Sequence, residues 1–71
     1  MTSYTCRLEG APDLTRVVKT SRGACRAAED YLETLYDNGN LNLAEAPFIV
    51  FVDELRLTVI FRPDFNAEEH P

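Results

Sequence analysis

Hydrophobic and polar positions in the first 20 residues predict two strands. Residues 4–9 carry apolar side chains at every second position, which is the period of a half-buried strand. Residues 14–20 are rich in β-branched residues, which favour a second strand. Because Gly10, Pro12 and Asp13 lie between them, we expect a hairpin with a connection over residues 10–13.

A helix is predicted over residues 22–38. Its apolar residues recur at the three- and four-residue spacing of one helical face: Ala24, Cys25, Ala28, Leu32 and Leu35. Thr20 and Ser21 offer hydroxyl groups for the N-cap, where a side-chain oxygen accepts from a free backbone amide. Gly39 after Asn38 predicts the helix end, since glycine readily adopts the left-handed conformation that stops a helix.

Two further strands are predicted over residues 48–52 and 55–62, with a short connection at 53–54 and Pro63 as the stop. The preceding loop contains Leu41 and Leu43, which we expect to pack onto the core. The expected fold is therefore α+β with the order ββαββ. It is a four-stranded, mostly antiparallel sheet with one helix packed on one face, and its strand order stays open. We assign residues 1–63 to a single domain and 64–71 to a flexible polar tail.

The last two predicted strands contain more apolar residues than one sheet face can hold. In the simplest register, one face takes six of them: Phe48, Val50, Val52, Leu57, Val59 and Phe61. Ile49, Phe51 and Ile60 then lie on the opposite face, together with Val17. One helix covers only one face of a sheet, so this second face needs another cover. A second copy of the chain, a different protein and the loop with Leu41 and Leu43 all stay open.

The net charge of −5 is distributed unevenly. Residues 1–28 contain five cations and two anions (+3), whereas residues 29–71 contain two cations and ten anions (−8). Four of these anions fill the C-terminal half of the predicted helix, where the helix dipole disfavours negative charge: Glu29, Asp30, Glu33 and Asp37. They form either a solvated face or an acidic surface for a basic partner. The total acidity argues against direct binding to nucleic acid.

Residues typical of catalysis are sparse. The single histidine, His70, is second from the end, and Ser3 and Ser21 have no partners for a catalytic triad. We therefore expect no enzyme, no cofactor and no metal site. Cys6 and Cys25 are predicted to be small buried residues, although a disulfide between them stays open.

The cellular location follows from what the N-terminal segment and the apolar runs lack. Residues 1–7 have no apolar signal-peptide core. No apolar run approaches the roughly 20 residues that span a bilayer. We therefore expect a cytoplasmic protein with no membrane partner.

A Tyr-Thr-Cys strand (residues 4–6), a Val-Val-Lys-Thr-Ser entry (17–21) into an Ala-rich helix, and two terminal strands make up the chain. In size, acidity and layout it resembles the small acidic anti-CRISPR proteins encoded by phages. The resemblance implies a non-enzymatic inhibitor, acting in the host cytoplasm as a DNA mimic. Such an inhibitor docks on a basic surface of a host defence complex, a protein or ribonucleoprotein, and blocks DNA binding. The charge pattern supplies its candidate contacts: Glu29, Asp30, Glu33, Asp37, Asp53 and Glu54.

Two alternatives stay open. One is a structural or regulatory homodimeric accessory protein whose interface is the outer sheet face with Ile49, Phe51 and Ile60. The other is a binder of nucleic acid or another anion that uses the cations of the first segment: Arg7, Arg16, Lys19, Arg22 and Arg26.

Overall fold

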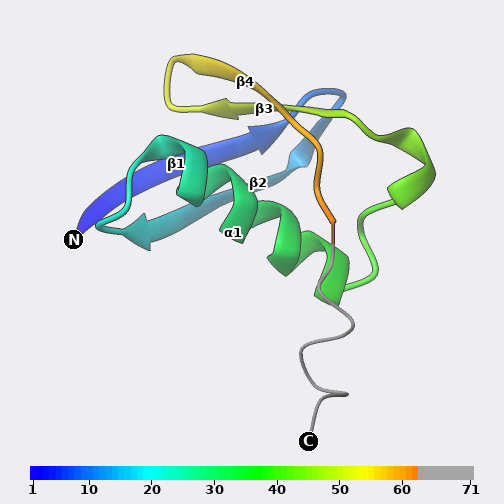
Figure 1. Ribbon diagram of the computed structural model, residues 1–71, viewed down its shortest axis with the longest axis horizontal. Helices are drawn as coiled ribbons and strands as arrows, with labels where there is room; N and C mark the ends of the chain where they lie inside the picture. The colour runs from blue at the N-terminus through cyan, green and yellow to red at the C-terminus, as the bar shows by residue number, and fades with distance from the viewer. Residues whose placement is uncertain (63–71) are drawn as a thin grey trace, which may run out of the picture.

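The computed structural model describes residues 1–62 and confirms the α+β class with the ββαββ order (Figure 1). Its elements are β1 (Thr2–Leu8), β2 (Ala11–Thr20), α1 (Ala24–Asp37), a short 3₁₀ helix η1 (Leu43–Glu45), β3 (Phe48–Val52) and β4 (Leu55–Val59). The strands form one antiparallel sheet in the order β2-β1-β3-β4, and α1 packs across one face. The tail predicted over 64–71, with His70, lies outside the described residues.

The first hairpin has a tighter turn than the sequence suggested. β1 and β2 are joined by Glu9 and Gly10 alone, and Gly10 has a φ of 82°, which glycine adopts without strain. The predicted connection over 10–13 is therefore wrong. Pro12 lies inside β2, which tolerates it because β2 is an edge strand. The pairing also shifts register here. Cys6 pairs with Arg16 and Leu8 pairs with Ala11, so an advance of two residues on β1 corresponds to five residues on β2.

Helix α1 begins later than predicted and has a different N-cap. Gly23 is the N-cap residue, and no side chain caps the helix there. The Thr20 hydroxyl instead accepts a hydrogen bond from the Arg22 amide at 3.1 Å, because Thr20 is the buried last residue of β2 and lies too early to reach the first turn. The predicted end is confirmed: α1 ends at Asp37, and Gly39 has a φ of 75°.

The core lies between α1 and the inner face of the sheet. The buried residues of the helix pack against those of β1 and β3: Ala27, Ala28, Tyr31, Leu32 and Leu35 with Cys6, Phe48, Val50 and Val52. The predicted inward face of β3 is thus confirmed, and Leu57, Val59 and Phe61 pack partly buried against the same cluster. Leu41 from the loop also packs there, as expected.

The chain leaves the sheet earlier than predicted, because β4 ends at Val59. Residues 60–62 continue along α1, where the Phe61 ring lies 5.9 Å from the Tyr36 ring. This contact holds the end of the described chain against the helix. None of the helices within residues 1–62 has the length and apolar character needed to cross a membrane.

The Tyr31 hydroxyl joins the helix to the irregular part of the sheet. It donates a hydrogen bond to the Leu14 carbonyl at 2.6 Å and accepts one from the Leu8 amide at 3.0 Å. Both backbone groups lie where the β1–β2 register shifts. The Tyr31 hydroxyl therefore gives them hydrogen-bond partners in place of the regular bonds between the two strands. Burial raises the pKa of Tyr31, which keeps the hydroxyl protonated and able to donate.

Candidate acidic docking surface on helix α1

Helix α1 presents four carboxylates, which we call the acidic surface: Glu29, Asp30, Glu33 and Asp37. The apolar residues of the helix turn toward the sheet, so side chains at four-residue spacing on the other side follow one line toward solvent. Glu29, Glu33 and Asp37 have this spacing and are exposed, whereas Asp30 is partly buried. The structure thus brings the four helical candidates together.

Only the N-terminal half of the acidic surface has a cation beside it, one for two carboxylates. The Arg26 guanidinium lies 3.1 Å from the Asp30 carboxylate and 3.8 Å from the Glu29 carboxylate. All three side chains are substantially exposed, so each pair contributes about 0.2–0.5 kcal/mol. Glu33 and Asp37 make no ion pair within residues 1–62, and the C-terminal half therefore keeps its negative charge.

The charges of α1 oppose its dipole. The first turn contains no acidic residue and the last turn contains no basic one, while Asp37 is the final helical residue. A carboxylate near the C-terminus of a helix costs about 0.3–1 kcal/mol, and the like charges of Glu33 and Asp37 at four-residue spacing add a few tenths. The stability of the helix therefore does not explain this placement.

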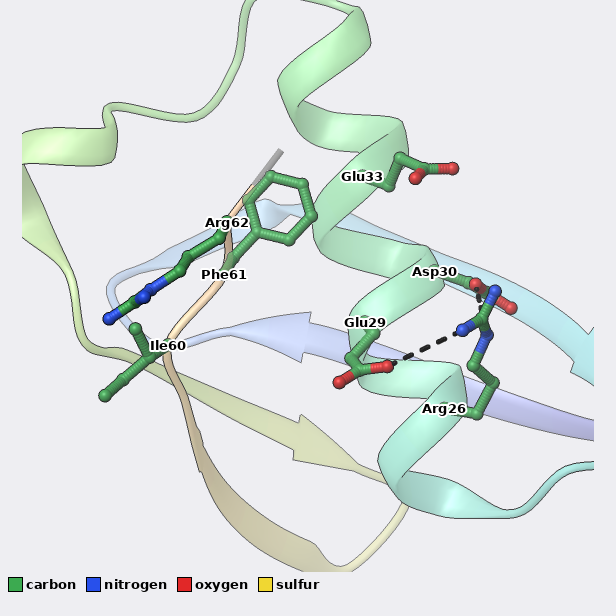
Figure 2. A pocket seen from close by; sticks show the side chains of 7 residues that line it. All are labelled: Arg26, Glu29, Asp30, Glu33, Ile60, Phe61 and Arg62. Carbon is green, nitrogen blue, oxygen red and sulfur yellow. Dashed lines mark ion pairs between the residues drawn. The ribbon is translucent and has the colours of Figure 1, made fainter. Parts of the chain in front are cut away.

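A groove runs beside the acidic surface, between α1 and the chain that follows β4 (Figure 2). It consists of two adjoining depressions of about 290 and 270 Å³, which share Glu29 and Ile60. We call it the helix–β4 groove. Glu33 lies on its helix wall, and Phe61 lies on the opposite wall. In Figure 2 the Arg62 side chain points away from the helix, so it does not cover the carboxylates.

The two turn carboxylates form a separate group. Asp53 has a φ of 54°; its carboxylate accepts a hydrogen bond from the Thr5 amide at 3.0 Å, and its own amide donates to the Thr5 carbonyl at 2.8 Å. Asp53 therefore fastens the β3–β4 turn to β1, while Glu54 beside it is exposed. Figure 1 shows this turn far from the C-terminal end of α1, so Asp53 and Glu54 do not form one surface with Asp37.

The outer sheet face is less apolar than its sequence pattern suggested. Val17 is 63% exposed, which agrees with the prediction that this face has no cover. Ile49 is partly buried. The Arg7 guanidinium, however, lies 4.4 Å from the centre of the Phe51 ring, and Arg56 is the β4 neighbour of Phe51. A cation over an aromatic ring contributes about 0.5–1 kcal/mol at an exposed site. The chain thus covers part of this face with its own charged side chain.

Ile60 lies just beyond the end of the sheet. It follows the end of β4 and lines the helix–β4 groove beside Glu29, with 63% of its surface exposed. Figure 2 shows its side chain pointing away from α1, whereas Val59 and Phe61 pack against the core on the helix side, as the predicted alternation requires. That Ile60 forms one interface with Ile49 and Phe51 stays a prediction.

Three cations of the first segment, Arg7, Arg16 and Arg26, lie apart from one another. Arg7 lies over the outer sheet face, whereas Arg26 pairs with the carboxylates of α1. Arg16 donates to the carbonyl groups of Asp13 and Thr15 within its own strand. This dispersal gives no support to the anion-binding alternative.

The two cysteines are both free and differ in environment. Cys6 is buried, and its thiol lies 3.8 Å from the Ala27 carbonyl. Burial, with smaller contributions from the charges of Asp53 and Asp30, raises the pKa of Cys6 from 9.0 to about 11. Cys25 is exposed beside the helix–β4 groove, so its predicted burial is wrong.

Comparisons of the chain with models of known protein families, with curated proteins and with solved structures found no match. Within residues 1–62, no three His, Cys, Asp or Glu side chains are grouped so that they could hold a metal ion.

Proposed function

We propose that this chain is a non-enzymatic protein-binding inhibitor, whose acidic surface docks on a basic, nucleic-acid-handling surface of a host defence complex. The observation that carries the proposal is the position of Glu33 and Asp37. Both are exposed, both lack an ion pair within residues 1–62, and both stand where they weaken the helix. Local features that oppose stability are expected at functional sites, where a contact with a partner compensates for them.

Electrostatics supplies the mechanism. Carboxylates four residues apart follow one another at about 6 Å along a helix, so Glu29, Glu33 and Asp37 form a negative row about 12 Å long. Cations that bind phosphate attract such a row, which speeds association and then competes with nucleic acid for the same surface. The anti-CRISPR-like role, the phage origin and the cytoplasmic location belong to this proposal, supported by size, acidity and layout.

The experiment measures binding to a purified CRISPR effector complex at low and at moderate salt. The test variant is Glu33→Lys with Asp37→Lys, and the matched control is Glu9→Lys with Glu45→Lys. Each double change moves the net charge from −5 to −1, and all four residues are exposed. We expect at least tenfold weaker binding for the helix variant and little change for the control. Equal affinities for the two variants would refute a role for the acidic surface.

The homodimeric accessory protein remains the second candidate, and the 63% exposure of Val17 on the outer sheet face favours it. Against it, Arg7 and Arg56 flank Phe51 on the same face, so two copies would bring like charges together. Light scattering separates the two proposals. The inhibitor is expected to be a monomer, whereas a dimer that dissociates on Val17→Lys would support the accessory protein.

A further inference from the structure

The two edges of the sheet differ in how well they are protected against pairing with another strand. β2 contains Pro12, and its register with β1 is interrupted. Both features hinder the pairing of another strand with this edge. β4 contains no proline, and its first residue, Leu55 (54%), and the residue that follows it, Ile60 (63%), are exposed. Among the described residues, β4 is therefore the edge open to a further strand.

Two backbone hydrogen bonds to the β1 side fix which way the amide and carbonyl groups of β3 point. The Asp53 amide donates to β1, and the Ile49 carbonyl accepts from β1, so the odd-numbered residues of this stretch face β1. Val50 and its even-numbered neighbours then face β4, where Val50 pairs with Leu57. Because the direction alternates along a strand, the amide and carbonyl groups of Thr58 point away from β3 to the open edge.

The helix–β4 groove gives this edge a side-chain environment. The lining beside the open backbone of Thr58 includes Leu57 and Ile60, and the helix wall of the groove carries Glu29, Asp30 and Glu33 together with Arg26. One cation faces three carboxylates, and Arg62 points away from the helix in Figure 2, so this wall keeps a net negative charge. A strand added to β4 would direct every second side chain toward the helix side of the sheet, where these carboxylates favour cations.

We infer that the β4 edge binds an extended basic peptide segment as a fifth strand, with its cationic side chains against Glu29 and Glu33. This inference rests on the proposed function, because it names the element of the basic partner that the chain recognises. A second copy of the chain fits the edge less well. In a symmetric β4–β4 pair the two helices would lie on the same side of the joined sheet and bring their carboxylates together.

The test uses a capped octapeptide of alternating Lys and Val, and the same peptide with Glu in place of Lys. Binding is followed by NMR titration of the backbone amides. Thr58→Pro removes the outward amide at an edge position that tolerates proline, and Thr58→Val is its matched control. The Lys–Val peptide is expected to bind at least tenfold more tightly than the Glu–Val peptide. Its affinity should fall at least tenfold in Thr58→Pro and stay unchanged in Thr58→Val.

A second arm leaves the protein untouched. Two N-methylated forms of the Lys–Val peptide are compared, one methylated at the odd-numbered amides and one at the even-numbered amides. Only one of these two sets faces β4, so we expect one form to lose binding and the other to keep it. Three results would overturn the inference. These are unchanged binding of both N-methylated peptides, equal binding of the Lys–Val and Glu–Val peptides, and a dimer of the protein that Thr58→Pro dissociates. If Thr58→Pro binds the effector complex normally while Glu33→Lys with Asp37→Lys does not, the inference fails and the proposed function survives.

Discussion

Replacing Tyr31 by phenylalanine tests how the helix is fastened to the sheet. The change removes one hydroxyl and leaves the ring in the core. It deprives the Leu8 amide of its acceptor at 3.0 Å and the Leu14 carbonyl of its donor at 2.6 Å. A buried polar group left without a partner costs about 1–3 kcal/mol. Because both groups are only partly buried, water recovers some of this loss, and we expect a total destabilisation of about 1.5–3 kcal/mol.

Urea denaturation followed by circular dichroism measures this loss. With a slope near 1 kcal/mol per molar urea, the midpoint of Tyr31→Phe should fall by roughly 1.5–3 M. Tyr4→Phe is the control, because the partly buried Tyr4 hydroxyl makes no hydrogen bond within residues 1–62. A midpoint shift no larger than that of the control would show that the Tyr31 hydroxyl does not stabilise the fold.

Three further predictions follow from the charges and the thiols. Asp37→Lys should raise the free energy of unfolding by about 0.3–1 kcal/mol, because it removes a carboxylate from the negative end of the dipole; an unchanged or lower melting temperature would contradict this. At pH 8 a thiol reagent should label Cys25 quickly and Cys6 only on unfolding, and mass spectrometry would expose equal labelling as a contradiction. The folded state keeps the Cys6 thiol protonated up to about pH 11, whereas the unfolded state releases the proton above about pH 9. Stability should therefore fall by roughly 2 kcal/mol between these values, and Cys6→Ala should flatten part of the decline.

The sequence predicted those parts of the fold that depend on local periodicity. The continuous apolar run over residues 48–52 correctly predicted the bounds of β3, and the two-residue period of a strand correctly predicted its buried face. Gly39 correctly marked the end of α1, because the stop depends on the conformation of that one residue.

The errors arose where distant residues decide the local structure. The β1–β2 register shift depends on the Tyr31 hydroxyl, which bonds to Leu8 and Leu14 from another element. The early end of β4 depends on Phe61 packing against Tyr36, and no local pattern encodes that contact.

The candidate site divides in the same way. Four-residue spacing on a helix was enough to place Glu29, Glu33 and Asp37 together on the exposed side. The separate role of Asp53 was beyond sequence patterns, because its carboxylate bonds to Thr5, 48 residues away in the chain. The helix–β4 groove was missed for a similar reason, since its two walls come from α1 and from residues 57–62, which are far apart in the sequence.

Competition with DNA tests the central claim most directly. The effector complex is titrated with labelled target DNA at several fixed concentrations of the protein, and bound DNA is followed by gel mobility shift. We predict that the half-saturating DNA concentration rises in proportion to the protein concentration, and that Glu33→Lys with Asp37→Lys abolishes this effect. A protein that binds the effector complex while DNA binding stays unchanged would contradict the claim that the acidic surface occupies a nucleic-acid-handling site.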